Sequence, residues 1–327
     1  MSANRLGIIV NPMSGRDVRR VAARASTSTH ENKQQQVTRL VLGAFANGVD
    51  EIFLVNEPFR ISARAIENLP QFHQVTMLDI PLTHTASDSI AAARAMWERG
   101  CRTFIVLGGD GTNRVVADAL PGARLLPLST GTNNVFPFMV EASVAGAAAG
   151  IVASGRVDVA TVCPPCKRVH VRVNNLTETA LVDAVLLQDD IRGSLLPFAP
   201  DKITHLFLAR AEPASIGMSP IGGYILPCHD NDNFGLLIET GIPARYQVTA
   251  PVSAGLYGDI LIKSIRQVPL DETVVFDGTG ILGFDGDRLL TADQDRIEVT
   301  FRRDGPAIIN PAGVMEAAVA AGAFTRN

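Results

Sequence analysis

The segment of residues 106–116, VLGGDGTNRVV, contains the side chains of this chain best suited to chemistry. An apolar run leads into GGDGT at residues 108–112, and a pattern typical of a helix follows at once. A glycine-rich turn lets backbone N–H groups approach phosphate oxygens because no Cβ intervenes, and the start of the next helix adds partial positive charge. Asp110 is informative, because a carboxylate beside phosphate is unfavourable unless it holds a metal or takes a proton. Both needs arise in phosphoryl transfer.

A tight strand-to-helix turn with Asp110 as the N-cap is the simpler interpretation of GGDGT. Two further segments argue against turn chemistry alone: residues 11–15 (NPMSG) and 129–134 (STGTNN) also follow apolar runs and are small and polar. Because the carboxyl ends of parallel strands meet at one edge of a sheet, we expect the three segments to converge on one crevice. Neither the GxxxxGK[ST] motif nor the dinucleotide motif GxGxxG occurs here.

The elements that must position these segments alternate between strand and helix up to about residue 153. We expect strands at 6–10, 51–55, 75–78, 103–107 and 124–128, and helices at 17–24, 35–46, 86–99 and 142–153. This alternation predicts an α/β domain over residues 1–153, with a Rossmann-like parallel sheet and helices on both faces.

The character of the chain changes after this point. Short β-rich runs separated by Gly, Pro, Asp and Asn occur at 157–162, 169–173, 180–187, 204–208, 234–239, 247–252, 274–276 and 296–301. They predict an antiparallel, all-β, sandwich-like domain over residues 154–304. The tail, residues 305–327, is apolar and partly helical, and we expect it to pack back on the first domain, with a tight cleft between the two domains.

Composition excludes some classes of function. The 327 residues carry a formal net charge of -4, which argues against nonspecific binding to nucleic acid or anionic lipid, since both need a dense field of Lys and Arg. No stretch approaches the roughly 18 to 20 apolar residues of a membrane span, so we expect no stable membrane insertion. The N-terminus lacks a long apolar segment, and we interpret the protein as cytoplasmic.

Four cysteines fit a reducing compartment. Cys163 and Cys166 form a CxxC motif between two strand-like runs, which favours a structural turn. Redox use is one alternative, and zinc is another, with Cys228 and His229 as the plausible additional pair.

The trio NPMSG, GGDGT and STGTNN resembles the superfamily that joins NAD kinases, diacylglycerol kinases and sphingosine kinases. The segment SPIGG at residues 219–223 is similar to the ATP-NAD kinase-like branch that includes the acetoin-catabolism X proteins. The resemblance implies an ATP-dependent and Mg²⁺-assisted kinase that transfers phosphate to a hydroxyl of a nucleotide or small molecule, with NAD as a possible acceptor. It also implies a homo-oligomer.

The resemblance also implies roles for individual residues. Asp110 is the expected catalytic residue, as general base or metal organiser. The expected nucleotide-binding residues are Asn11, Ser14, Gly15, Gly108, Gly109, Gly111, Thr112, Thr130, Gly131, Thr132 and Asn133. Asp285 and Asp287, in the sequence FDGD, resemble an element that lipid kinases present from the second domain to hold Mg²⁺ or orient an acceptor. The alternative for Asp285 is the corner of a hairpin turn. No complete set of metal ligands is assigned.

Two departures bear on the acceptor. NAD kinases carry an Asn-Glu or Asn-Asp pair where this chain has Val182 and Asp183, and the loss of the amide argues against NAD. Asp183 remains a possible acceptor or metal contact. GTNNVF is closer to the lipid-kinase pattern, so a lipid kinase stays open. A regulatory protein that binds nucleotide without transfer is the second alternative.

Overall fold

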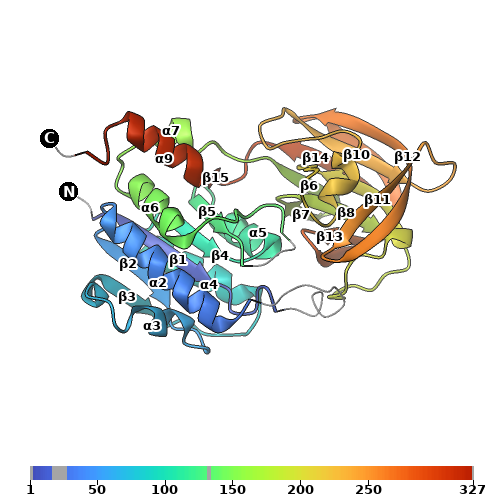
Figure 1. Ribbon diagram of the computed structural model, residues 1–327. Helices are drawn as coiled ribbons and strands as arrows, with labels where there is room; N and C mark the ends of the chain where they lie inside the picture. The colour runs from blue at the N-terminus through green and yellow to red at the C-terminus, as the bar shows by residue number, and fades with distance from the viewer. Residues whose placement is uncertain (1–2, 17–27, 131–133, 326–327) are drawn as a thin grey trace.

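The protein is described by a computed structural model that covers residues 3–16, 28–130 and 134–325. The chain forms two lobes side by side, with both termini on the same lobe (Figure 1). We call the lobe built on the parallel sheet the α/β domain and the other lobe the β domain. The expected helix at residues 17–24 lies outside the described residues.

The α/β domain is built on a parallel sheet of six strands within the described residues, in the order β15-β5-β4-β1-β2-β3. The strands are β1 (Arg5–Val10), β2 (Glu51–Val55), β3 (Val75–Leu78), β4 (Thr103–Leu107), β5 (Arg124–Leu128) and β15 (Ala307–Ile308). The five strands expected from the sequence are confirmed, and so is the α/β fold class. The strand order reverses direction between β1 and β4, and ligands of such sheets bind at the carboxyl side of this switch point.

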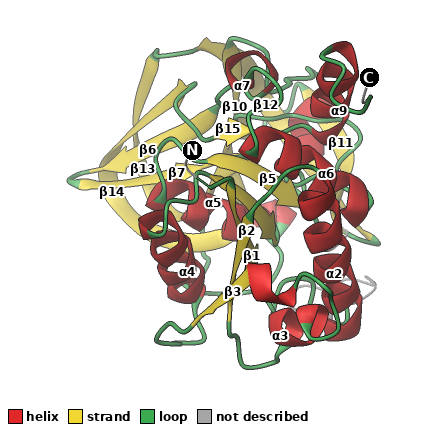
Figure 2. Cartoon of the chain, turned by 90° about the vertical axis from the view of Figure 1, so that its left-hand side faces the viewer, coloured by secondary structure: helices red, strands yellow, loops and turns green. Residues whose placement is uncertain are grey.

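Helices cover both faces of this sheet (Figure 2). They are α2 (His30–Ala46), α3 (Ile61–Ile66), α4 (Ala86–Glu98), α5 (Asp110–Ala119), α6 (Ala142–Ala153), α7 (Val159–Val162) and α9 (Pro311–Ala320), with the 3-10 turn η1 (Phe72–Gln74). Alternate residues of a strand face opposite layers. In β4, Ile105 and Leu107 pack in the core beneath α2 and α6, whereas Phe104 and Val106 pack beneath α4 and α5.

Two helices differ from the sequence-based expectation. α2 begins five residues before the expected start at residue 35, because Thr29 is its N-cap and its hydroxyl accepts the N–H of Asn32 at 3.1 Å. The six-residue helix α3 is too short to produce a periodic apolar pattern.

The β domain is one antiparallel sheet of nine strands within the described ranges, ordered β11-β12-β10-β9-β8-β13-β14-β6-β7. Its strands are β6 (Arg168–Val173), β7 (Leu176–Ala180), β8 (Asp183–Leu187), β9 (Ile203–Leu208), β10 (Phe234–Thr240), β11 (Tyr246–Ser253), β12 (Leu256–Pro269), β13 (Thr273–Phe284) and β14 (Asp287–Arg302). The short helices η2 (Pro200–Lys202) and α8 (Ser219–Gly223) connect them. The sheet folds over on itself, since Phe301 of β14 packs directly against Gly235 of the non-adjacent strand β10.

Two of the expected strands are wrong, the first because of a local helix cap and the second because of a tertiary contact. Residues 157–162 contain helix α7, because the carboxylate of Asp158 caps it and accepts the N–H of Ala160. Residues 180–187 are divided between β7 and β8, because the N–H groups of Leu181 and Val182 donate to the carboxylate of Asp285.

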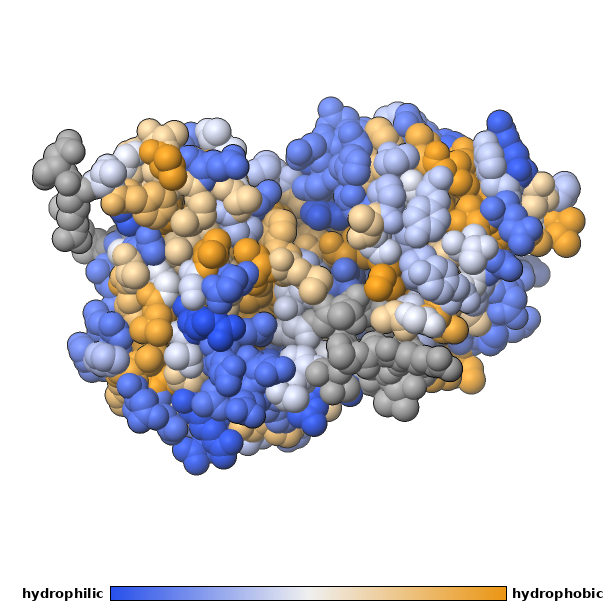
Figure 3. All heavy atoms as spheres, viewed as in Figure 1, coloured by the Kyte–Doolittle hydropathy of each residue, from blue (hydrophilic) through white to orange (hydrophobic). Residues whose placement is uncertain are grey.

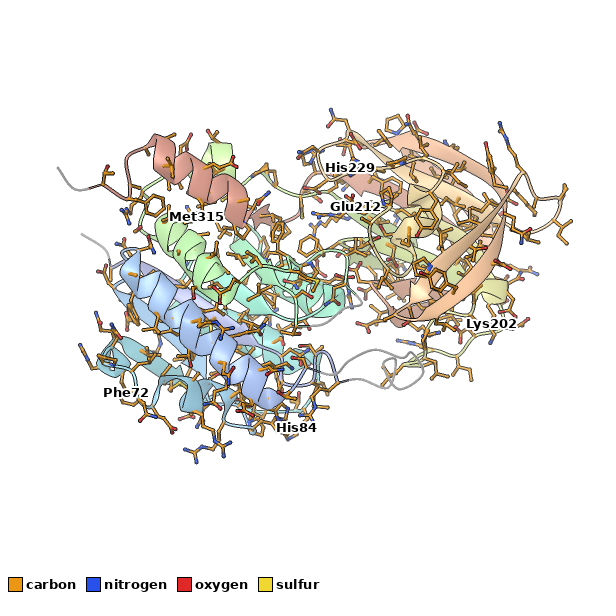
Figure 4. The ribbon with its side chains drawn as sticks, in the orientation of Figure 1. Phe72, His84, Lys202, Glu212, His229 and Met315 are labelled. Atoms are coloured by element: carbon orange, nitrogen blue, oxygen red, sulfur yellow. The ribbon has the colours of Figure 1, made fainter. Side chains whose placement is uncertain are left out.

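The CxxC motif lies in the connection between the two domains, after α7 and before β6. Burial raises the pKa of Cys163 to about 11 and that of Cys166 to about 12, so both thiols are protonated at neutral pH, which counts against redox use. His229 lies 2.7 Å from Glu212 on the β domain (Figure 4), and Cys228 is buried in the core of that domain. Over residues 3–16, 28–130 and 134–325, no three side chains of the Cys, His, Asp or Glu type are grouped to hold a metal.

The tail returns to the α/β domain. β15 pairs with β5, and Val314 and Ala318 of α9 are buried in the core shared with α6. Met315 of α9 is partly buried against the same core, above α6 in Figure 4. In the described part of the chain, no helix combines the length and apolar character needed to cross a membrane.

The crossing of α2 and α6 generates the first prediction. A Cβ at Gly146 of α6 would lie 2.3 Å from the carbonyl oxygen of Leu40 in α2. We therefore expect Gly146→Ala to lower the free energy of unfolding by about 1 to 3 kcal/mol, although alanine favours helices.

Gly313→Ala is the matched control, because a Cβ at Gly313 of α9 would meet nothing within 4 Å. This variant should leave stability unchanged or raise it by up to about 1 kcal/mol. Urea unfolding measures both variants. Equal effects of the two substitutions would contradict the close crossing.

Candidate active site

A cavity of about 510 Å³ opens at the carboxyl edge of the parallel sheet, between the two domains. The loops that follow β1, β2, β3 and β4 line it from the α/β side. Leu195, Asp285 and Asp287 line it from the β domain. Figure 3 shows a notch between the two lobes in the upper outline of the molecule. The cavity therefore lies at the switch point of the strand order, where the fold favours ligand binding.

The GGDGT segment joins β4 to α5 at the floor of this cavity. Gly109 is the N-cap residue and Asp110 begins the helix. The first-turn N–H groups of a helix have no carbonyl partner within that helix, and they are suited to binding an anion. The Asp110 carboxylate accepts the N–H of Phe136 at 2.9 Å and that of Val135 at 3.1 Å, which ties the chain beyond β5 to this loop.

Two glycines of the segment permit close approach by neighbouring side chains. A Cβ at Gly109 would lie 2.7 Å from Asn134 Oδ1, and a Cβ at Gly111 would lie 3.0 Å from Asp287 Oδ2. The second contact joins the two domains. The glycines thus serve the packing of the site, in addition to any access that they give to a phosphate.

The loop after β1 is bonded to the other two segments. Asn11 Nδ2 donates to Thr112 Oγ1 at 2.8 Å, and the hydroxyls of Ser14 and Thr130 lie 2.6 Å apart. The structure therefore brings together parts of all three segments that the sequence analysis singled out.

The cavity does not include every expected residue. Asn11, Ser14, Gly15, Gly109, Asp110, Gly111, Thr112, Asp285 and Asp287 line it, whereas Gly108, Thr130 and Asp183 do not. Gly131, Thr132 and Asn133 lie outside the described residues. Val182, which the resemblance aligns with an amide side chain of NAD kinases, is fully buried in the apolar core.

Lys33 supports the β1 loop from below, a role that the sequence did not indicate. Its side chain is fully buried in α2, and Nζ donates to the carbonyl oxygens of Asn11, Pro12 and Ser14 at 2.9, 2.7 and 2.6 Å. A lone lysine near a helix start is usually a surface residue, so only the fold reveals this role.

Asp285 occupies the turn between β13 and β14, and it is also part of the site. Its φ of 46° and that of Gly286, 91°, are the left-handed values of a two-residue type I′ hairpin. The carboxylate is buried and accepts the N–H groups of Leu181, Val182 and Asp183 at 2.8, 2.9 and 3.2 Å. The hairpin-corner alternative is therefore correct, and this corner reaches the cavity.

Arg114 connects the hairpin to α5. Its side chain is 6% exposed and lies 3.1 Å from Asp287, 3.9 Å from Asp285 and 3.9 Å from Glu178. A buried arginine among three carboxylates offsets their repulsion and joins the two domains. Its place two residues after GGDGT was the available sequence signal.

The buried carboxylate of Asp285 perturbs the titration of the partly buried Asp110. Burial is the largest cause that raises the pKa of Asp110 to about 7, and the negative charge of Asp285 is the next largest. The N–H groups of Phe136 and Val135 act in the opposite direction and lower this pKa. Burial also raises the pKa of Asp285, against the charge of Arg114. At neutral pH the pair therefore carries less than two full negative charges.

Comparison with known proteins agrees with this geometry. Residues 6–157 match the ATP-NAD kinase N-terminal domain, the class of domain that the parallel sheet and the GGDGT loop define. Residues 167–304 match the acetoin catabolism protein X C-terminal domain. Acetoin catabolism protein X of Cupriavidus necator is 30% identical over 311 residues, which are 90% of this chain and 87% of that protein. The chain belongs to the acetoin catabolism protein X family, and the resemblance expected from the sequence is confirmed.

A solved structure is also similar. The crystal structure of an NAD kinase from Archaeoglobus fulgidus in complex with ATP aligns with a TM-score of 0.40 and 10% identity, over 84% of this chain and 98% of that one.

The raised pKa of Asp110 predicts how stability depends on pH. An unfolded aspartate titrates near 4, whereas the pKa of Asp110 is about 7 in the fold. Between about pH 4 and about pH 7 the folded state binds a proton at Asp110 that the unfolded state does not bind. The contribution of this proton to the free energy of unfolding is therefore complete below about pH 4 and is lost as pH rises through about 7. Relative to Asp110→Asn, the unfolding free energy of the wild type should fall as pH rises from about 5 to about 8. A difference that does not change with pH would contradict the raised pKa.

Proposed function

We propose that this protein is an ATP-dependent phosphotransferase of the NAD-kinase type, which moves a phosphoryl group to a hydroxyl of a nucleotide or small-molecule acceptor. The observation that carries the proposal is the position of Asp110, a carboxylate with a pKa near 7 at the start of a helix, in a cavity lined by both domains. The match of residues 6–157 to the ATP-NAD kinase N-terminal domain supports it.

The donor phosphates would bind where the fold concentrates N–H groups and hydroxyls. The first turn of α5 presents its backbone N–H groups and the positive end of the helix to the cavity floor. Asn11 and Ser14 line the same region on the adjacent β1 loop. Because the net charge of the chain is -4, this local arrangement must bind the anion without a surrounding basic surface.

Asp110 would take the proton of the acceptor hydroxyl. A general base works best when its pKa lies near the operating pH, which is the condition that burial and Asp285 create. Arg114 holds Asp287 beside the loop and offsets the negative charge of the hairpin. Phosphoryl transfer otherwise depends mainly on positioning and charge neutralisation.

The residues fit a Mg²⁺ ion that arrives with the nucleotide. Mg²⁺ is usually held by one or two carboxylates together with substrate phosphates. Asp287 lines the cavity and would contact it, whereas Asp110 is the proposed base and Asp285 already accepts three N–H groups. When bound, the ion would neutralise charge on the transferred group.

A lipid or other amphiphilic hydroxyl compound is a second candidate acceptor. The loop between β8 and β9 exposes Ile191, Leu195 and Leu196 by 74%, 54% and 54%, and Leu195 also lines the cavity. Apolar side chains on the acceptor side of a cavity favour an acceptor with an apolar part. The packing of Val182 in the core argues in the same direction, away from NAD.

The test is transfer of label from ATP with Mg²⁺ into separate mixtures of NAD and NADH, small metabolites, and diacylglycerol vesicles. Asp110→Asn should lower the rate by about 10² to 10⁴-fold, the usual contribution of a general base. Asp118→Asn is the control, because Asp118 lies on the same helix, is exposed and does not line the cavity. An active Asp110→Asn enzyme would remove Asp110 from the mechanism, and bound ATP without labelled product would favour a nucleotide-binding regulator.

The pH dependence of transfer provides a separate prediction. The ionised form of Asp110 is the base, so the rate should rise with pH and level off above about 7. Asp285→Asn removes a neighbouring negative charge and should move this rise to lower pH. A rate that does not change between about pH 5 and 8 would contradict the role of Asp110 as base.

A further inference from the structure

Glu57 is a buried carboxylate of the cavity wall to which phosphoryl transfer, as described above, gives no role. It follows β2 by two residues, is 7% exposed and lines the cavity. Its two oxygens accept the N–H groups of Phe59 at 2.8 Å and Ser62 at 3.0 Å, so the loop holds the carboxylate in one orientation. Within residues 3–16, 28–130 and 134–325, no Lys or Arg forms an ion pair with it.

The position of Glu57 along the sheet edge relates it to the phosphate loop. The strand order is β4-β1-β2, and neighbouring strands lie about 4.8 Å apart, so the β2 loop is about 10 Å from GGDGT along the edge. A triphosphate that begins at the first turn of α5 and crosses the β1 loop would bring its ribose to this place. In dinucleotide-binding sheets of this strand order, whose phosphates lie at the turn after the first strand, an acidic side chain near the end of the second strand binds a ribose hydroxyl.

The surroundings of Glu57 suit the nucleobase of a nucleotide. Val55, Phe59, Ile80 and Leu82 line this side of the cavity, and the Phe59 ring packs on His30 with ring centroids 4.3 Å apart. The groups from the β domain, Leu195, Asp285 and Asp287, line the same cavity from across the cleft and belong to the acceptor side. The donor nucleoside therefore has its own walls, at the ends of β2 and β3.

We propose that Glu57 binds the ribose hydroxyls of the donor nucleotide and so selects ribonucleotides. The inference rests on the proposed function for the identity of the donor. A carboxylate oxygen offers two lone-pair sites, and the backbone N–H groups occupy one on each oxygen of Glu57. The remaining sites accept the 2′ and 3′ hydroxyls.

The experiment compares the affinities of ATP and 2′,3′-dideoxy-ATP by titration calorimetry, for the wild type and for Glu57→Gln. The wild type should bind ATP about tenfold or more tightly, because hydrogen bonds to a charged group are lost with the analogue. Glu57→Gln should lose most of this preference. The ratio of the two affinities is taken within each variant, so a general loosening of the loop, which weakens both ligands equally, does not change it.

Glu141→Gln is the matched control, because the Glu141 carboxylate also accepts a backbone N–H, that of Ser143, but does not line the cavity. It should keep the wild-type preference. Nucleotide binding by the wild type without discrimination, or an unchanged preference in Glu57→Gln, would overturn the role of Glu57 alone. A wild type that binds no nucleotide would overturn the proposed function as well.

Discussion

The repulsion between two carboxylates of the cavity, the partly buried Asp110 and the buried Asp285, is the constraint on which the site depends. They come from different domains, and each is compensated by its own set of groups. Backbone N–H groups of residues 135 and 136 stabilise Asp110, and those of residues 181 to 183 stabilise Asp285. Arg114 lies beside the hairpin and reduces the remaining charge. The break between β7 and β8 supplies the three N–H groups that Asp285 accepts.

The fold supplies the rest of the site through positions along one sheet edge. The switch point between β1 and β4 creates the crevice, Lys33 fixes the β1 loop from the helix below, and the hairpin closes the crevice from the β domain. In the proposed function, the donor phosphates and the nucleobase would lie along that edge, and the acceptor would lie across the cleft. The first-turn N–H groups of α5 would then bind the phosphates of the donor in a chain whose net charge is -4.

The sequence predicted those features that local patterns determine. The five core strands are short apolar runs bounded by turn residues, and GGDGT, NPMSG and STGTNN follow three of them directly. Features that depend on distant contacts were not predictable. Residues 180–187 form one apolar run whose interruption is set by Asp285, about a hundred positions away. Lys33 and Glu57 are lone charged residues, which usually lie on the surface, and only packing identifies them as buried.

The most direct test of the account is a crystal structure with a non-hydrolysable ATP analogue and Mg²⁺. The account predicts that the terminal phosphate contacts the first-turn N–H groups of α5 beside Asp110, with the nucleoside extending toward the end of β2. A nucleotide bound elsewhere, or one with its phosphates directed away from Asp110, would contradict it.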